Sequence, residues 1–276
     1  MHSSPTVSRS AAPGPRLLRS MLADVEWRDL VGLTRLEVLR ELTLSLPWLA
    51  LSLLLAAHAL CLPALAASFM LFLTGLRQVH NAHHYALGLS RRATEWFLFA
   101  MSVVMLGAMH AVQFNHLRHH KLCMTEGDAE AASARLRGWQ AIAIGPYFPL
   151  MLHWTALRLG KRRTRLWIAA ELAANALWIA AVFAWFDLAM LRYHVLAMGA
   201  AQCLTAFFAV WTVHHDTEAH AYPARTQRGR LKNLVSYHMF LHVEHHLFPQ
   251  VPTCHLPALA RRLDAAMPAL AQAMVI

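Results

Sequence analysis

The sequence predicts an all-α protein that is integral to a membrane, and three observations support this fold class. The 276 residues are 57% hydrophobic and only 14% charged, whereas soluble domains average about 25% charged residues. Two long segments carry almost no charge, as membrane helices require. Basic residues exceed acidic ones by 25 to 15, which in so apolar a chain indicates a membrane surface rather than nucleic acid.

The first 43 residues are expected to precede the membrane domain. Residues 1–15 predict a tail, and residues 16–43 predict a basic amphipathic helix that lies on the membrane surface or in solvent. No compact apolar segment typical of a signal peptide is seen here. Residues 44–262 are predicted to form the membrane domain, and residues 263–276 a C-terminal tail.

Residues 45–76 hold no Asp, Glu, Lys or Arg and predict the first helical hairpin. About 20 residues cross a bilayer, so this run is too long for one span and short for two. Cys61-Leu62-Pro63 interrupts it, because proline breaks a helix interior. We expect one helix over 45–61 and a second over 64–80.

A second hairpin is expected over 166–186 and 188–213, joined near Asp187. Glu171 and Asn175 lie on its first helix, where a polar side chain is costly unless it faces the protein interior. The two hairpins together give about four transmembrane helices.

The segments between the hairpins are expected to contain interfacial helices. Residues 96–114 are apolar but lie between two histidine clusters. Both ends then lie on one side of the membrane, so a half-inserted or interfacial helix is expected rather than a span. Residues 125–140 are expected to form a polar loop, and residues 141–157 are too short and too interrupted by proline for a span.

The basic residues predict the orientation in the membrane. Arg77–Arg92, Lys161–Arg165 and Arg225–Lys232 fall on the face that also holds the N-terminal tail. The positive-inside rule makes this face cytoplasmic, and nearly all the clustered histidines map to it. We expect a cytoplasmic histidine-rich cap. The composition, rich in Ala, Leu and Arg, favours a bacterial inner membrane.

The chain has 19 histidines, more than its 15 acidic residues, and three segments repeat the pattern HxxHH. They are HNAHH at 80–84, HLRHH at 116–120 and HVEHH at 242–246. Residues i, i+3 and i+4 share one face of a helix, so each segment presents its imidazoles together. At this histidine frequency, three matches would arise by chance in roughly one chain in ten thousand. The pattern therefore indicates a function.

Clustered neutral imidazoles suit a transition metal such as iron, zinc, copper or nickel. Eight or nine ligands exceed the four that one zinc takes, so two metals are expected. Two adjacent irons activate O2, and an apolar pocket suits an inert hydrocarbon substrate. HExxH, the pattern of a zinc peptidase, is absent, and a bis-histidine haem would use more isolated histidines.

Further side chains are open candidates for the site. The segment HHDTEAH over 214–220 follows the last span, and one of its histidines is a candidate ninth ligand, with an acidic neighbour orienting imidazoles. The candidates for metal binding or for supporting a ligand are His83, His214, Asp216, Glu218, His220 and His238. The histidines assigned to packing or to the surface are His2, His58, His110, His153, His194 and His255.

These motifs resemble those of the membrane fatty acid desaturase family, within the wider group of histidine-box di-iron desaturases and hydroxylases. EHHLFPQVP at 244–252 is particularly similar to the third box, and the resemblance covers about residues 45–262. It favours His84 over the additional His83 in the first box. A ninth ligand near the end of the last span is implied, which we take as His215, with His214 as the alternative. The implied ligands in the boxes are His80, His84, His116, His119, His120, His242, His245 and His246.

The resemblance implies a membrane-bound di-iron fatty acyl (lipid) desaturase that uses O2 and two electrons to break unactivated C–H bonds. A separate ferredoxin, rubredoxin or cytochrome would supply the electrons, because no cytochrome b5 domain is seen. One alternative is a hydroxylase or ketolase of the same scaffold acting on a carotenoid, alkane or lipid. Another is a non-catalytic metal-binding membrane protein. The sequence does not predict the substrate-binding residues.

Overall fold

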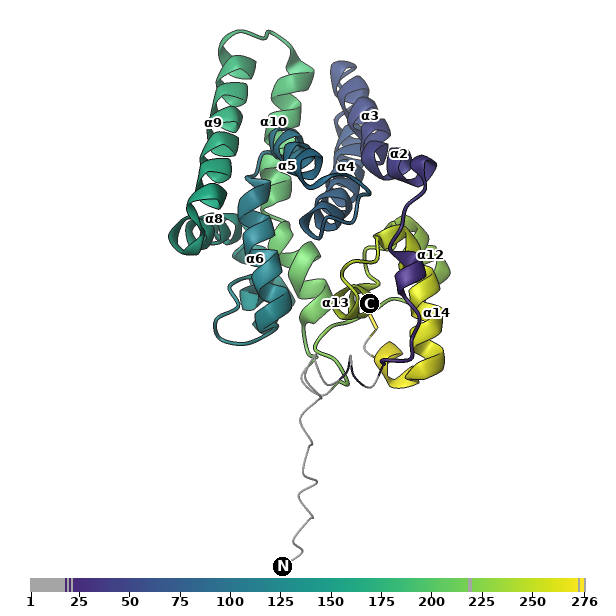
Figure 1. Ribbon diagram of the computed structural model, residues 1–276. Helices are drawn as coiled ribbons and strands as arrows, with labels where there is room; N and C mark the ends of the chain where they lie inside the picture. Colours follow the sequence, from purple (N-terminus) through teal and green to yellow (C-terminus); the bar gives the residue numbers. More distant parts are fainter. Residues whose placement is uncertain (1–17, 19, 21, 218–219, 273, 276) are drawn as a thin grey trace, which may run out of the picture.

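The protein is all-helical in the part of the chain that the structure describes. The computed structural model describes residues 18, 20, 22–217, 220–272, 274 and 275. Among these residues there is no strand, and the only β-pairing is two isolated bridges at Thr226. A bundle of longer helices stands above a smaller set of short helices from the C-terminal part (Figure 1). The predicted all-α fold class is confirmed.

Two helices lie where the first hairpin was expected, and the turn between them lies earlier than predicted. α2 (Arg35–Thr43) and α3 (Leu46–Ala57) form one candidate span, and α4 (Cys61–His83) forms the next. The chain reverses over residues 58–60, where Ala59 is left-handed at φ 57°. Pro63 lies in the first turn of α4, where its missing N–H costs nothing. The proline therefore begins the second helix instead of ending the first.

The N-terminal segment is not the single helix expected over 16–43. Between Leu22 and Thr34 the described chain forms turns and the 3-10 helix η1 (Arg28–Leu30). α2 begins where Thr34 caps it, since the Thr34 hydroxyl accepts from the Glu37 N–H and the Glu37 carboxylate accepts from the Thr34 N–H. The predicted tail over 1–15 lies outside the described residues.

The apolar segment 96–114 contains a sharp break rather than one helix. α5 (Arg91–Met105) and α6 (Met109–Leu122) meet at 113°. α6 therefore begins inside the protein, where its first N–H groups need acceptors. Glu171 accepts from the His110 N–H at 3.1 Å, and the His153 Nε2 accepts from the Ala108 N–H at 3.0 Å. The break is typical of a broken or re-entrant span.

The second apolar pair follows two short helices, α7 (Gly138–Ala143) and α8 (Tyr147–Leu159), and an earlier 3-10 helix η2 (Glu130–Arg135). α9 (Arg162–Ala184) is a candidate span, and Glu171 and Asn175 are buried on it as predicted. α10 (Ala189–Gln202) continues after a bend of 42° into a π-helix (Ala206–Trp211) and α11 (Thr212–His214). The described chain thus has three candidate spans, or up to five if each bent pair is one span.

The C-terminal part forms a separate layer of short helices below the spans. They are α12 (Arg230–Val235), α13 (His242–Leu247), η4 (Thr253–His255), α14 (Leu256–Ala266) and η5 (Pro268–Ala271). Leu247, Leu256 and Leu259 pack there with Leu18 and Leu22 from the N-terminal segment. Both ends of the described chain therefore contribute to one apolar core beneath the membrane helices (Figure 1).

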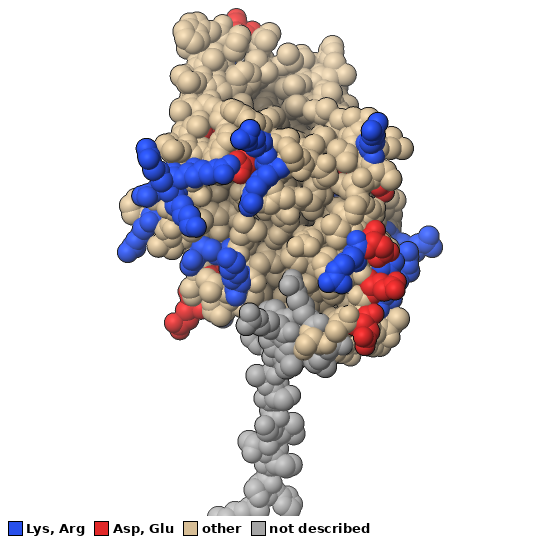
Figure 2. Space-filling model, in the orientation of Figure 1, with Lys and Arg blue, Asp and Glu red and all other residues tan. Residues whose placement is uncertain are grey.

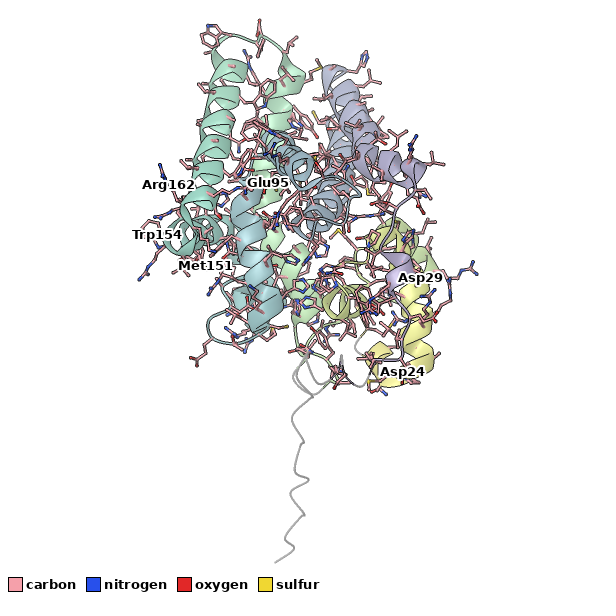
Figure 3. All side chains as sticks on the ribbon, viewed as in Figure 1. Asp24, Asp29, Glu95, Met151, Trp154 and Arg162 are labelled. Atoms are coloured by element: carbon pink, nitrogen blue, oxygen red, sulfur yellow. The ribbon has the colours of Figure 1, made fainter. Side chains whose placement is uncertain are left out.

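The surface supports membrane insertion. Large apolar side chains are exposed on α3, α9 and α10, among them Leu54, Leu177 and Leu196. On the face drawn in Figure 2, Lys and Arg gather over the middle and lower parts, and the upper end carries none. Trp154, which is 67% exposed, lies beside Arg162 at the outer edge of that basic region (Figure 3). Such a belt of aromatic and basic residues is typical of a membrane interface.

A buried ion pair joins α2 to α4. Arg77 was expected at the charged end of α4, yet it is only 3% exposed and pairs with Glu41 of α2. The Asn81 amide also donates to Glu41, at 3.1 Å, and the Asn81 carbonyl oxygen accepts from the Thr253 hydroxyl at 2.6 Å. These bonds tie α2, α4 and the C-terminal layer together just before the first histidine cluster.

Glu41→Ala should strongly destabilise the protein, because it leaves Arg77 buried and unpaired. We expect a loss of roughly 3–5 kcal/mol, measured as a lower melting temperature of the purified protein in detergent. Arg192→Ala, which removes the exposed pair with Asp187, should cost less than about 1 kcal/mol. The double variant Glu41→Leu with Arg77→Met should recover most of the loss. If Glu41→Ala and Arg192→Ala lowered the melting temperature equally, this account would be contradicted.

Candidate metal centre

The three histidine boxes converge at one end of the helical bundle. The first lies in the last turn of α4, the second on α6, and the third on α13 of the C-terminal layer. α11 adds a histidine at the end of the last apolar segment. Four segments far apart in the sequence therefore supply one site.

The imidazoles form two adjacent groups. Within each group the candidate ligand nitrogens lie within 4.8 Å of one another. The first group is His80, His84, His116 and His245, and the second is His119, His214, His242 and His246. His120 lies between them: its Nε2 is 3.1 Å from that of His116 and 3.0 Å from that of His245, and its ring stacks on His246.

The hydrogen bonds at the outer nitrogens fix how the rings are turned. The Nδ1 of His119 is 2.7 Å from Asp128 Oδ2, that of His116 is 2.9 Å from Glu130 Oε1, and that of His214 is 2.7 Å from the Pro223 carbonyl oxygen. Carboxylate and carbonyl oxygens accept here, so each Nδ1 carries the proton. In a neutral ring, Nε2 then presents a lone pair toward the centre of its group.

These inward nitrogens fit a bound cation. The Nε2 atoms of His119 and His214 lie 2.9 Å apart, and those of His214 and His242 lie 3.0 Å apart. The Nε2 atoms of His80 and His84 are buried and have no hydrogen-bond partner among the described residues. Lone pairs that face one another in a buried site repel unless a metal lies between them. The donor set, all imidazole, is one that iron accepts.

Burial keeps the third box in the neutral form. Loss of hydration lowers the pKa of His242, His245 and His246 well below the usual histidine value, and neighbouring imidazoles add to this effect. Neutral imidazole is the form that coordinates a metal. Burial would raise the pKa of Asp128, but the hydrogen bond from His119 and two backbone N–H groups keep that pKa below its usual value.

Asp128 and Glu130 were not singled out from the sequence. Both lie in the acidic run TEGDAE that follows the second box, within the region expected to be only a polar loop. A histidine that binds a metal commonly donates its other ring N–H to a carboxylate, and this hydrogen bond fixes the orientation of the ring. The sequence feature that could have identified these two carboxylates is an acidic run within ten residues of a histidine box.

The structure does not bring every candidate into the two groups. His215 lies outside them: its Nδ1 donates to the Trp211 carbonyl oxygen at 2.7 Å and its ring stacks on the Trp211 ring. His214 ends the helix, whereas His215 has extended backbone and is turned away. His83 is buried next to the first group but belongs to neither. Glu218 lies outside the described residues, and the candidates that also lie outside both groups are Asp216, His220 and His238.

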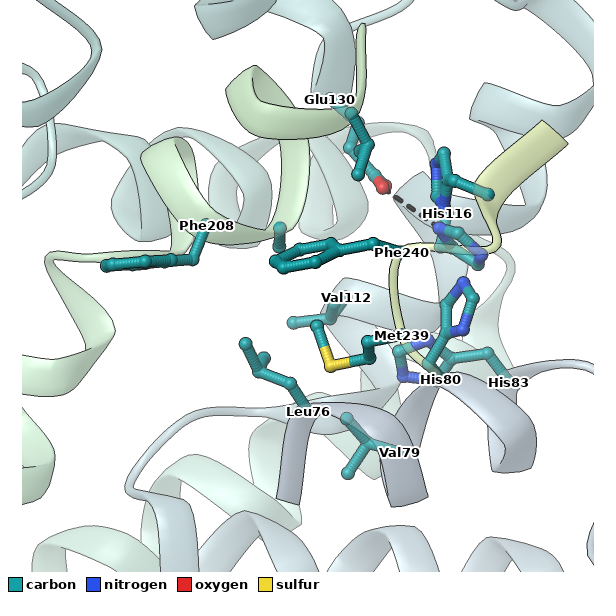
Figure 4. Close-up of a pocket in the computed structure, with 13 residues that line it drawn as sticks. Leu76, Val79, His80, His83, Val112, His116, Glu130, Phe208, Met239 and Phe240 are labelled. Atoms are coloured by element: carbon teal, nitrogen blue, oxygen red, sulfur yellow. Dashed lines mark hydrogen bonds and ion pairs between the residues drawn. The ribbon is translucent and has the colours of Figure 1, made fainter. Parts of the chain in front are cut away.

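An apolar cavity opens beside the first group. Its volume is about 70 Å³, so it is a narrow space between the side chains. His80, His83 and His116 lie at one end, and Phe208 lies at the other (Figure 4). A second cavity shares Leu76 and Val79 with it and extends between the helices to Met105, Phe148 and Leu152. The histidine cluster therefore adjoins two small apolar cavities that share part of their lining.

A bundle of apolar helices with two histidine groups that could each hold a metal ion indicates the class of protein, and comparison with known families agrees. The sequence model described as "Fatty acid desaturase" matches residues 41–275. The chain belongs to the fatty acid desaturase family. The human (Homo sapiens) protein "Sphingolipid delta(4)-desaturase/C4-monooxygenase DES2" is 26% identical over 203 residues, which are 66% of this chain and 59% of the relative. The match thus spans about three fifths of that relative's length.

His214→Ala should lower the metal content, whereas His215→Ala should not. His214 belongs to one of the two groups and His215 to neither, so loss of His214 should remove roughly half of any metal that the site binds. Iron per chain, measured by elemental analysis of the purified variants, tests this difference. Equal losses in the two variants, or a larger loss in His215→Ala, would show that the geometry has been misread.

Asp128→Asn should weaken metal binding by about 10–100-fold, because the amide holds the His119 ring less firmly. The measurement is the chelator concentration that removes half of the iron. Asp216→Asn is the matched control, since Asp216 is exposed and lies outside both groups. If Asp128→Asn retains metal as well as this control does, the carboxylate does not support the centre.

Proposed function

We propose that the protein is a membrane-bound, O2-dependent di-iron desaturase of fatty acyl or lipid chains. The observation that carries the proposal is the pair of adjacent imidazole groups at the end of an apolar cavity. Membership of the fatty acid desaturase family supports the same chemistry. The proposed ligands are His80, His84, His116, His119, His120, His214, His242, His245 and His246.

Two irons at these residues would supply the oxidising chemistry: O2 is reduced to two waters by two electrons, two protons and the two hydrogens removed from the substrate. The chain's own residues position the reactants. Leu76, Val79 and Val112 line both cavities, so an acyl chain would be held there in a water-poor environment. Glu130 and Asp128 hold the ring protons of two ligands and fix their orientation.

Hydroxylation is the second candidate reaction, because the human relative is named both a desaturase and a monooxygenase. The two outcomes differ only in whether a second hydrogen or an oxygen atom follows the first abstraction. Metal transport is a weaker candidate, since a transporter needs polar ligands through the membrane depth. Here the two groups gather at the ends of α4, α6 and α11.

The setting of the enzyme follows from the same proposal. The metal centre would face the cytoplasm of a bacterial cell from the inner membrane, since the basic segments lie at that end. A soluble ferredoxin, rubredoxin or cytochrome would then deliver electrons from the aqueous side. The lipid substrate would enter from the bilayer.

Expression in a bacterial host that makes only saturated lipids should yield new double bonds in the lipid extract, detected by mass spectrometry. His119→Ala should abolish the product, because it removes one ligand and the hydrogen bond to Asp128. His220→Ala, outside both groups, should retain it. New hydroxyl groups in place of double bonds would favour the monooxygenase. Zinc alone in the purified protein, without O2-dependent activity, would overturn the proposal.

A further inference from the structure

Two polar side chains at the histidine end of the cavity have hydrogen-bonding atoms that no described residue satisfies. The Oε2 of Glu130 and both ring nitrogens of His83 are buried and have no partner. Both residues line the cavity, whose remaining walls are mostly apolar. Buried polar atoms nearly always find a partner in a folded protein. Their partners are therefore expected to come from a bound molecule.

Both side chains lie next to the same ligand histidine. Glu130 uses its other oxygen, Oε1, to hold the His116 Nδ1 at 2.9 Å. The His83 ring centroid is 5.6 Å from that of His116. Figure 4 shows the Glu130 carboxylate directed at His116, with His80 and His83 on the other side of His116. A group bound by this pair would lie beside the first group of imidazoles.

The chemistry of the pair selects the bound group. A carboxylate oxygen that accepts hydrogen bonds repels a carboxylate or phosphate head and attracts a donor. A neutral imidazole offers one donor and one acceptor. A hydroxyl group can donate to the Glu130 Oε2 and accept from the N–H of a neutral His83 ring, which leaves the other His83 nitrogen to a second donor.

We propose that Glu130 and His83 recognise a hydroxyl group that the substrate carries close to the carbons that react. This inference rests on the proposed desaturase function and narrows it to a hydroxyl-bearing long-chain lipid. His83 is the additional histidine of the first box, outside both metal groups. The pair thus gives it a role as a specificity-determining residue rather than a ligand.

The test compares substrates of equal chain length that differ only in the hydroxyl. One arm uses an N-acylated long-chain 2-amino-1,3-diol, another a 3-hydroxyacyl chain, and the third a plain acyl chain. A site built to bind a hydroxyl rejects an analogue that lacks it. We expect kcat/KM to favour one of the hydroxylated substrates by at least about 100-fold, and the better arm identifies the source of the hydroxyl.

The variant His83→Phe keeps the ring and removes both nitrogens. We expect it to reduce the preference for the hydroxylated substrate to less than about tenfold while the iron content stays at the wild-type level. His194→Phe is the matched control, because His194 is a buried histidine that does not line the cavity. It should leave the preference unchanged. If the preference fell in both variants, the cause would be altered packing and not the loss of the His83 nitrogens.

A second measurement does not depend on turnover. Without an electron donor the iron-loaded protein binds lipid but does not react, and the rise in melting temperature reports affinity. The hydroxylated lipid should stabilise the wild-type protein more than the plain one, and His83→Phe should remove that difference.

The outcomes separate this inference from the function on which it rests. Equal use of plain and hydroxylated chains would overturn the recognition pair and leave the desaturase standing. Loss of iron in His83→Phe would make His83 a ligand and would also overturn it. If no substrate is converted by iron-loaded protein, the desaturase proposal fails, and the binding measurement still decides whether a hydroxyl is recognised.

Discussion

The structure depends on imidazole lone pairs that are brought together in an apolar interior. Hydrogen bonds to Asp128 and to the Pro223 carbonyl oxygen fix the protons of His119 and His214 on Nδ1. Their Nε2 atoms are thereby left as acceptors that face one another at 2.9 Å. Such an arrangement is unfavourable in the folded protein alone and becomes favourable once a cation is shared. Binding of a metal here would consequently be coupled to the packing of these helices.

This convergence explains the irregular helices of the bundle. A continuous span would carry the second box across the membrane, whereas the break between α5 and α6 returns it to the first. The break exposes backbone N–H groups within the protein, and Glu171 and His153 satisfy them. The buried pair of Glu41 and Arg77 holds α4 to the C-terminal layer through Asn81. The costly polar groups inside the bundle therefore serve the geometry of the metal centre.

Patterns within one segment were predictable, and contacts between segments were not. The HxxHH spacing identified the boxes, because a shared helix face is a local property. The choice between His214 and His215 depended on which residue ends the helix and which has extended backbone, and neighbouring identical residues give no signal for that. Pro63 was misread because proline is compatible with both ends of a helical break. Glu130 was missed because its partner, His116, is fourteen residues away on another element.

An acyl chain in an apolar cavity has little to fix its register. Burial of one more CH2 group contributes about 0.8 kcal/mol, so neighbouring positions of the chain differ little in free energy. An enzyme that attacks one bond must therefore fix the chain either at the closed end of the cavity or at a polar anchor. The anchor is more precise the closer it lies to the metal, since few rotatable bonds then separate it from the reacting carbon. Glu130 and His83 adjoin His116 itself, which is the position where a single hydroxyl would align the chain with least freedom.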